Sequence, residues 1–104
     1  MRIADNFVRL DIAEGVNVTE EVMTEKHIPK YTIGVAVRLT GVPDYRLRRY
    51  EEAGLLKPAR TKAGQRLYSD ADIELIREIS PLEEEGINLE GIKAILAMRR
   101  GERK

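Results

Sequence analysis

Glycine and proline divide the middle of this chain into short segments, and this division most constrains how the chain can fold. Thr32 stands where a helix N-cap is favoured, and apolar residues recur at helical spacing as far as Leu39, after which Gly41 stops the helix. Pro43 suits the first turn of a second helix, which meets no breaker until Gly54. Two short helices joined by a glycine-containing turn predict a helix-turn-helix.

The second helix, residues 43–53, has an inner and an outer face when its residues are placed at about 100° per residue. Leu47 and Tyr50 fall on the inner face, and Arg46 falls on the flank. The outward-facing side chains are those of Tyr45, Arg48, Arg49 and Glu52. Guanidinium groups can grip guanine edges or phosphates, so the pattern is typical of a recognition helix in the major groove of DNA.

Charge is concentrated in the same part of the chain. The 104 residues carry 18 basic and 18 acidic side chains, a net charge of zero. Residues 31–70, however, hold eight basic and four acidic side chains, whereas residues 1–30 and 71–104 each have a net charge of −2. A polyanion is the natural partner of such a basic island, provided that its cations are not already paired with carboxylates of the chain.

A basic hairpin is expected after the second helix. Small residues at Ala63 and Gly64 lie between two extended basic flanks, which predicts a wing over residues 57–68 with its tip at residues 62–64. From this wing, Arg60, Lys62 and Arg66 would contact a phosphate backbone or a minor groove. Tyr68 would close the wing and reach a phosphate through its hydroxyl group.

Two further helices complete the expected fold. Ser69 and Asp72 form a capping box before a helix with core residues at Ile73, Ile76, Ile79 and Leu82, which Pro81 would kink. Asn88 caps the last helix. The prediction is a mainly α fold with a small β wing: a winged helix-turn-helix of four helices and a short hairpin over residues 31–98. Residues 1–30 would form an arm, partly disordered or with a strand at residues 8–12, and residues 99–104 a charged tail.

The order of these segments resembles the DNA-binding domain of the MerR family of bacterial transcription regulators. The residues that carry the resemblance are Tyr31-Thr32-Ile33-Gly34, Leu39-Thr40-Gly41-Val42, Leu47-Arg48-Arg49-Tyr50-Glu51, Gly54-Leu55-Leu56 with Pro58, Arg66-Leu67-Tyr68 with Asp72-Ile73, and Glu85-Gly86-Ile87 with Leu89 and Ile92-Lys93. Within the family, the last block is most similar to that of the heat-shock repressor HspR and the nitrogen regulators GlnR and TnrA.

The resemblance implies a homodimer that binds a palindromic operator in double-stranded DNA. The implied contact residues are Tyr45, Arg46, Arg48, Arg49, Arg60, Lys62 and Arg66, with Arg48 serving either a phosphate or the anchoring of its helix. Tyr68, from the analysis of the wing, completes the expected DNA-binding set. Arg49 departs from the family pattern, which usually has tyrosine there, and adds a positive charge to the surface expected to face DNA. Family members commonly continue into a long dimerising helix, whereas this sequence stops soon after Met98.

Other functions have less support from the sequence. The chain has no cysteine and one histidine, His27, so we expect no thiolate chemistry, no metal site and no cofactor. No nucleophile and base stand at a workable spacing, and no apolar run approaches the roughly 20 residues of a membrane helix, so we expect a cytoplasmic protein that is not an enzyme. The alternatives are an excisionase-like architectural DNA-binding protein and an interaction adaptor that docks through residues 8–12. Residues 83–85, three glutamates, read as a solvated helix end, with a contact to RNA polymerase as the alternative.

Overall fold

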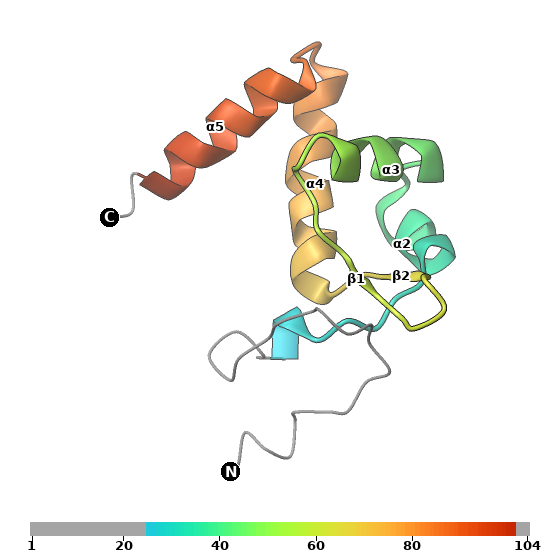
Figure 1. The fold of residues 1–104 in the computed structure, drawn as a ribbon. Helices are drawn as coiled ribbons and strands as arrows, with labels where there is room; N and C mark the ends of the chain where they lie inside the picture. The colour runs from blue at the N-terminus through green and yellow to red at the C-terminus, as the bar shows by residue number, and fades with distance from the viewer. Residues whose placement is uncertain (1–24, 102–104) are drawn as a thin grey trace.

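The computed structural model describes residues 25–101, and its elements follow the expected order (Figure 1). They are η1 (Glu25–His27), α2 (Ile33–Thr40), α3 (Asp44–Glu52), β1 (Ala59–Arg60), β2 (Arg66–Leu67), α4 (Asp70–Glu84) and α5 (Leu89–Gly101). The prediction of a mainly helical fold with four α-helices and a short antiparallel hairpin is confirmed.

The turn between α2 and α3 is built by the residues that the sequence indicated. Thr32 Oγ1 accepts a hydrogen bond from the Val35 amide at 3.4 Å and caps α2. Gly41 ends this helix with φ of 75°, a left-handed conformation that glycine adopts at low cost. Pro43 is the N-cap of α3 rather than its first helical residue, and Gly54 follows the helix with φ of 83°.

The capping predictions for α4 and α5 are also confirmed. Ser69 and Asp72 form a complete capping box, with Ser69 Oγ accepting from the Asp72 amide and the Asp72 carboxylate from the Ser69 amide. Asn88 Oδ1 accepts from the Gly91 amide at 2.8 Å before α5. As expected, α4 extends across Pro81 and ends at Glu84. One boundary differs from expectation, because α5 continues to Gly101 and the first residues of the expected tail are helical.

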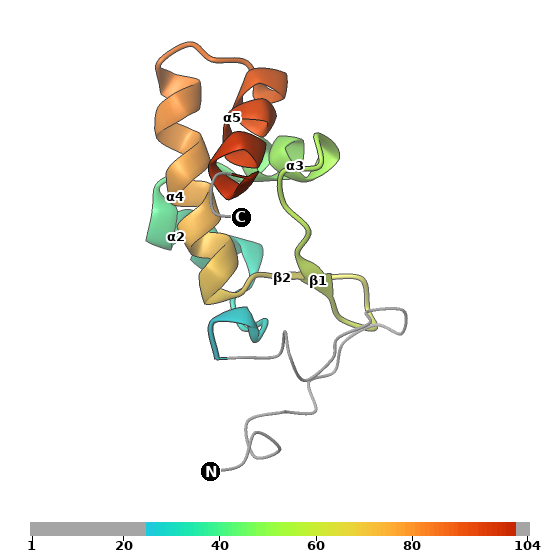
Figure 2. The same ribbon diagram turned by 90° about the vertical axis from the view of Figure 1, so that its left-hand side faces the viewer.

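The hydrophobic core lies where α4 packs against α2, α3 and α5, as the two views show (Figures 1 and 2). The isoleucines of α4 supply its centre, as expected, and Ile92 and Leu96 of α5 close one side. The buried side chains that form this core are those of Ala36, Val42, Leu47, Tyr50, Leu55, Leu56, Tyr68, Ile73, Ile76, Ile79, Ile92 and Leu96. This core fixes α3 with one face inward and the opposite face in solvent.

Residues 25–30, which the sequence assigned to the N-terminal arm, pack on α4. Pro29 is buried, Lys26 pairs with Glu74 at 3.3 Å, and Lys30 pairs with Asp70 at 3.1 Å. The expected strand at residues 8–12, and with it the docking segment of the adaptor alternative, lies outside the described residues.

The wing is a two-stranded antiparallel ladder that pairs Ala59 with Leu67 and Arg60 with Arg66. A further bridge continues it, because Tyr31 and Tyr68 exchange two backbone hydrogen bonds of 2.8 and 2.7 Å. The chain entering α2 is therefore joined to the strand leaving the wing, and both lie beside the start of α4 (Figure 1).

Candidate nucleic-acid interface

The exposed face of α3 carries the side chains that the sequence placed there. Leu47 and Tyr50 are fully buried, whereas Tyr45 is 59% exposed and Arg49 is 44% exposed at the side chain. Arg48 is also exposed and pairs with Asp44 one helical turn earlier at 3.1 Å. The predicted orientation of the helix is confirmed, and it presents one aromatic and two guanidinium groups to solvent.

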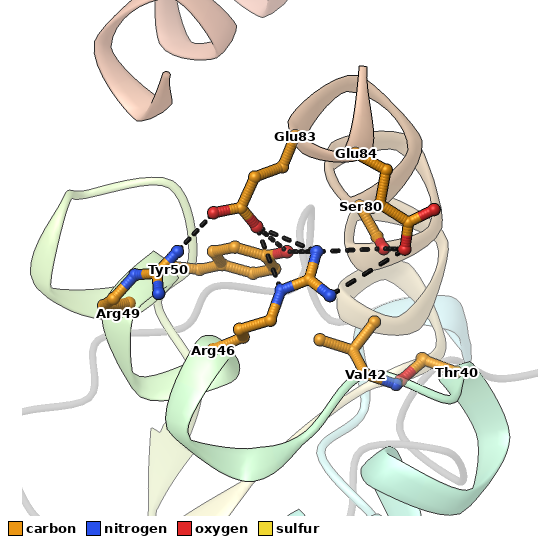
Figure 3. Close-up of polar contacts among 8 residues, drawn as sticks. All are labelled: Thr40, Val42, Arg46, Arg49, Tyr50, Ser80, Glu83 and Glu84. Atoms are coloured by element: carbon orange, nitrogen blue, oxygen red, sulfur yellow. Dashed lines mark hydrogen bonds and ion pairs between the residues drawn. The ribbon is translucent and has the colours of Figure 1, made fainter. Parts of the chain in front are cut away.

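Arg46 lies on the flank of α3, as expected, but its side chain turns toward α4 and away from the surface expected to contact DNA. Its side chain is only 17% exposed and lies against α4 (Figure 3). Its guanidinium donates to Glu83 Oε1 at 2.8 and 3.0 Å and to the Tyr50 hydroxyl at 3.0 Å. A weaker contact of 3.8 Å joins it to Glu84. The hydrogen-bonding groups of Arg46 point into the protein, and this side chain links α3 to α4.

Glu83 is the central hydrogen-bond acceptor of the junction between α3 and α4. The interpretation of residues 83–85 as a wholly solvated helix end is therefore wrong for Glu83. Its Oε1 accepts from Arg46 and from the Tyr50 hydroxyl at 2.8 Å, and its Oε2 accepts from Arg49 (Figure 3). Burial would raise the pKa of this carboxyl group, but the hydrogen bonds from Tyr50 and Arg46 outweigh burial and lower the pKa. Burial and the contact with Glu83 raise the pKa of Tyr50 to about 12, so its phenol remains a donor at neutral pH.

A second carboxylate, that of Glu51, joins α3 to the wing. Its two oxygens accept from Arg60 at 3.0 Å and from Arg66 at 2.6 Å, the two residues that face each other across the hairpin. Burial opposes ionisation of Glu51, but the hydrogen bonds from these arginines prevail and its pKa is lowered. Lys62 stays exposed at the tip of the wing, within the tight turn closed by the Gly64 amide and the Thr61 carbonyl.

Tyr68 lies in the core. Its hydroxyl group therefore cannot reach a phosphate, contrary to the expectation. It is fully buried, and its hydroxyl oxygen has no hydrogen-bond partner among the described residues. The ladder that pairs its backbone with Tyr31 turns the side chain inward beneath the wing. Its place in the expected DNA-binding set was therefore wrong, and its role is to support the hairpin from below.

The two organising carboxylates were not found from the sequence. Glu51 contacts residues nine and fifteen positions away, and Glu83 contacts residues 33 to 37 positions away. Helical periodicity reports which face a residue occupies, but it carries no information on such distant partners. The five arginines of the expected interface all have a carboxylate partner in the structure. The basic island is therefore less available to bind a polyanion than its net charge suggests.

Residues 25–101 contain neither a metal-ligand cluster nor a membrane-spanning helix. No group of three or more histidine, aspartate or glutamate side chains in this part is placed to hold a metal ion. None of the helices described has both the length and the apolar character needed to cross a membrane.

Comparison with known proteins identifies the family. The model for MerR HTH family regulatory proteins matches residues 31–99. The putative heat shock protein HspR of Streptomyces coelicolor is 46% identical over 71 residues, which are 67% of this chain and 47% of HspR. The HTH-type transcriptional regulator GlnR of Bacillus anthracis is 39% identical over 71 residues, covering 68% of this chain and 55% of GlnR. The chain thus spans about half the length of these curated relatives.

A solved structure gives the same result. The crystal structure of HiNmlR, a MerR family regulator lacking the sensor domain, bound to promoter DNA, matches with a TM-score of 0.55 and 30% sequence identity. The match covers 62% of this chain and 52% of that one. The resemblance inferred from the motifs is confirmed, and the chain belongs to the MerR HTH family of regulatory proteins.

Proposed function

We propose that this protein is a sequence-specific transcription regulator that binds double-stranded DNA. In this proposal α3 enters the major groove, and the wing of β1 and β2 lies on the flanking backbone or in the minor groove. The observation that carries the proposal is the outward face of α3, where Tyr45, Arg48 and Arg49 project from a helix whose other face is fixed in the core. The similarity to HiNmlR, which was crystallised with promoter DNA, supports it.

The burial and pairing of the arginines assign them different roles. Arg48 and Arg49 are half exposed, and exposed ion pairs contribute only about 0–1 kcal/mol, so either can exchange a carboxylate for a phosphate or a base edge. Lys62 would contact phosphate from the tip of the wing. Arg60 and Arg66 would reach DNA only while Glu51 holds the wing in position. Arg46 and Tyr68 are left out of the interface.

The proposal includes a homodimer on a palindromic operator, because symmetric half-sites match a two-fold protein. It places the protein in the cytoplasm, where bacterial chromosomal DNA lies, and assigns it no catalytic activity. A contact with RNA polymerase would use Glu84 and Glu85, which are exposed, since Glu83 is held by α3.

Selection of bound sites from a random duplex pool tests this function. We expect enrichment of one motif as an inverted repeat with fixed spacing, and guanines opposite the α3 arginines. Failure to retain any duplex at low salt would refute DNA binding altogether. Retention without an enriched motif, together with bending of the bound DNA, would instead favour the excisionase-like alternative.

A further inference from the structure

We propose that Glu83 is a positioning residue that limits how much positive charge the recognition helix offers to DNA, by holding Arg49 until a phosphate replaces it. This inference rests on the proposed DNA-binding function. It concerns a carboxylate on α4, outside the expected DNA-binding surface of α3 and the wing, and it assigns different tasks to its two oxygens.

The geometry separates these two tasks. Oε1 faces inward and accepts from Arg46 and Tyr50, two groups that are themselves partly or fully buried. Oε2 faces the rim of the junction and accepts from the exposed Arg49 (Figure 3). Glu83 is 19% exposed, and Arg46 and Tyr50 hold its Oε1. These contacts are independent of Arg49, so they can keep the carboxylate in place when Arg49 leaves. The inner contacts fix α3 on α4, and the outer contact can open without disturbing them.

The charges explain why the outer contact matters. Arg46 and Arg49 bring two positive charges to a junction where Glu83 and Glu84 bring two negative charges. Arg49 is therefore neutralised before DNA arrives, and a phosphate that binds it must displace Oε2. Because Arg49 is already paired with a carboxylate, its contact with a phosphate contributes less to the binding free energy through counterion release than the contact of an unpaired arginine would. This pairing lowers the affinity for every duplex, whatever its sequence.

Replacement of Glu83 by glutamine tests the separation of tasks. The amide of Glu83→Gln keeps one acceptor oxygen for Arg46 and Tyr50, and it puts an NH₂ group, which cannot accept a hydrogen bond, toward Arg49. We expect the variant to bind a random-sequence duplex roughly two- to fivefold more tightly, the fold-change that corresponds to one exposed ion pair. The slope of log K against log salt should steepen by about one unit.

Glu84→Gln is the matched control. It removes one negative charge from the residue that follows Glu83. The Glu84 side chain contacts Arg46 at 3.8 Å and has no ion pair with Arg49 among the described residues. A general loss of negative charge near DNA would affect both variants equally. The proposal expects a smaller change in affinity for Glu84→Gln and a slope close to that of the wild type.

A double-mutant cycle with Arg49→Ala identifies the route of the effect. If Glu83 acts through Arg49, Arg49→Ala removes the gain of Glu83→Gln, but it leaves the small effect of Glu84→Gln unchanged. A gain that survives in the Arg49→Ala background overturns the proposal, as does a wild-type slope in Glu83→Gln. If the wild type itself fails to bind DNA at low salt, the proposed function fails and the inference fails with it.

A second measurement avoids any loss of folding in Glu83→Gln. The side-chain NMR signals of the arginines in the wild-type protein are followed while a random duplex is added. The Nε–Hε signal of Arg49 should shift as its partner changes, while that of Arg46 should remain that of a group bound to Glu83. Movement of both signals, or of neither, would contradict separate roles for the two oxygens.

Discussion

Arg46 and Arg49 lie three positions apart on α3, yet only the second faces solvent. The angular position of Arg46 on the helix left it at the edge between core and solvent, and its neighbours on α4 decided the outcome. Such a flank residue cannot be assigned from its own helix, because its environment is supplied by a segment more than 30 residues away. For Leu47, Tyr50 and the exposed arginines, by contrast, the periodicity alone was sufficient.

Arg46→Ala should therefore weaken the fold rather than remove a DNA contact. Its loss leaves the partly buried Glu83 without two of its hydrogen bonds, and we expect the free energy of unfolding to fall by about 1–3 kcal/mol. Urea unfolding measures the change, with Arg48→Ala on the exposed face as the control. Unchanged stability with lost DNA affinity would return Arg46 to the interface.

Tyr68→Phe tests the burial of Tyr68. Since its hydroxyl oxygen is buried without a partner among the described residues, removal of that oxygen should leave stability unchanged or raise it by up to about 1 kcal/mol. DNA affinity should be the same as in the wild type. A weaker complex in a fully folded variant would show that the hydroxyl reaches the nucleic acid.

At the scale of elements, Glu51 joins α3 to the wing, because it accepts a hydrogen bond from one arginine on each strand of the hairpin. The lowered pKa of Glu51 means that its ionised form stabilises the folded state. That contribution is complete above the ordinary carboxyl value of 4.5 and is lost as pH falls through the lower folded-state value.

The stability difference between the wild type and Glu51→Gln should therefore be largest near neutral pH and shrink as pH falls below about 4.5. Thermal unfolding of both proteins across the pH range measures this difference, and the exposed neighbour in Glu52→Gln serves as the control. A difference that stays constant with pH would mean that the charge of Glu51 does not hold the wing.

The tip of the wing offers a separate prediction. Lys62→Ala should weaken binding to all duplexes alike and flatten the salt slope by about one unit, because one phosphate contact is lost. Selectivity between the operator and random DNA should not change. Titrations at several salt concentrations measure the slope, and an unchanged slope would remove the tip from the interface.

Helix starts and turns were predicted well, because capping is a local property. Thr32, Ser69 and Asn88 each bind a backbone amide within three residues, so the sequence contains the whole interaction. The ends of the domain were predicted less well. Residues 25–30 lack helical or strand periodicity, and they are ordered by contacts with α4 that no local pattern reports.

At the scale of the whole molecule, those six residues should contribute measurably to stability. A chain beginning at residue 25 retains the buried Pro29 and the ion pairs to α4, whereas one beginning at residue 31 loses them. We expect the shorter chain to be less stable by roughly 1–2 kcal/mol, mainly from lost apolar burial. Urea unfolding compares the two, and equal midpoints would show that residues 25–30 only rest on the domain.

The bridge between Tyr31 and Tyr68 has a mechanical consequence for DNA binding. The segment ahead of α2 is hydrogen-bonded to the residue that follows β2 through the amides of Tyr31 and Tyr68, and the Lys30 amide adds a third bond to the Tyr68 carbonyl. A wing that moves toward a duplex must either move together with the segment ahead of α2 or break these backbone hydrogen bonds. Hydrogen–deuterium exchange at the amides of Tyr31 and Tyr68 separates these cases. Continued protection in the complex indicates that the two segments move together, and faster exchange indicates that the bridge between them opens.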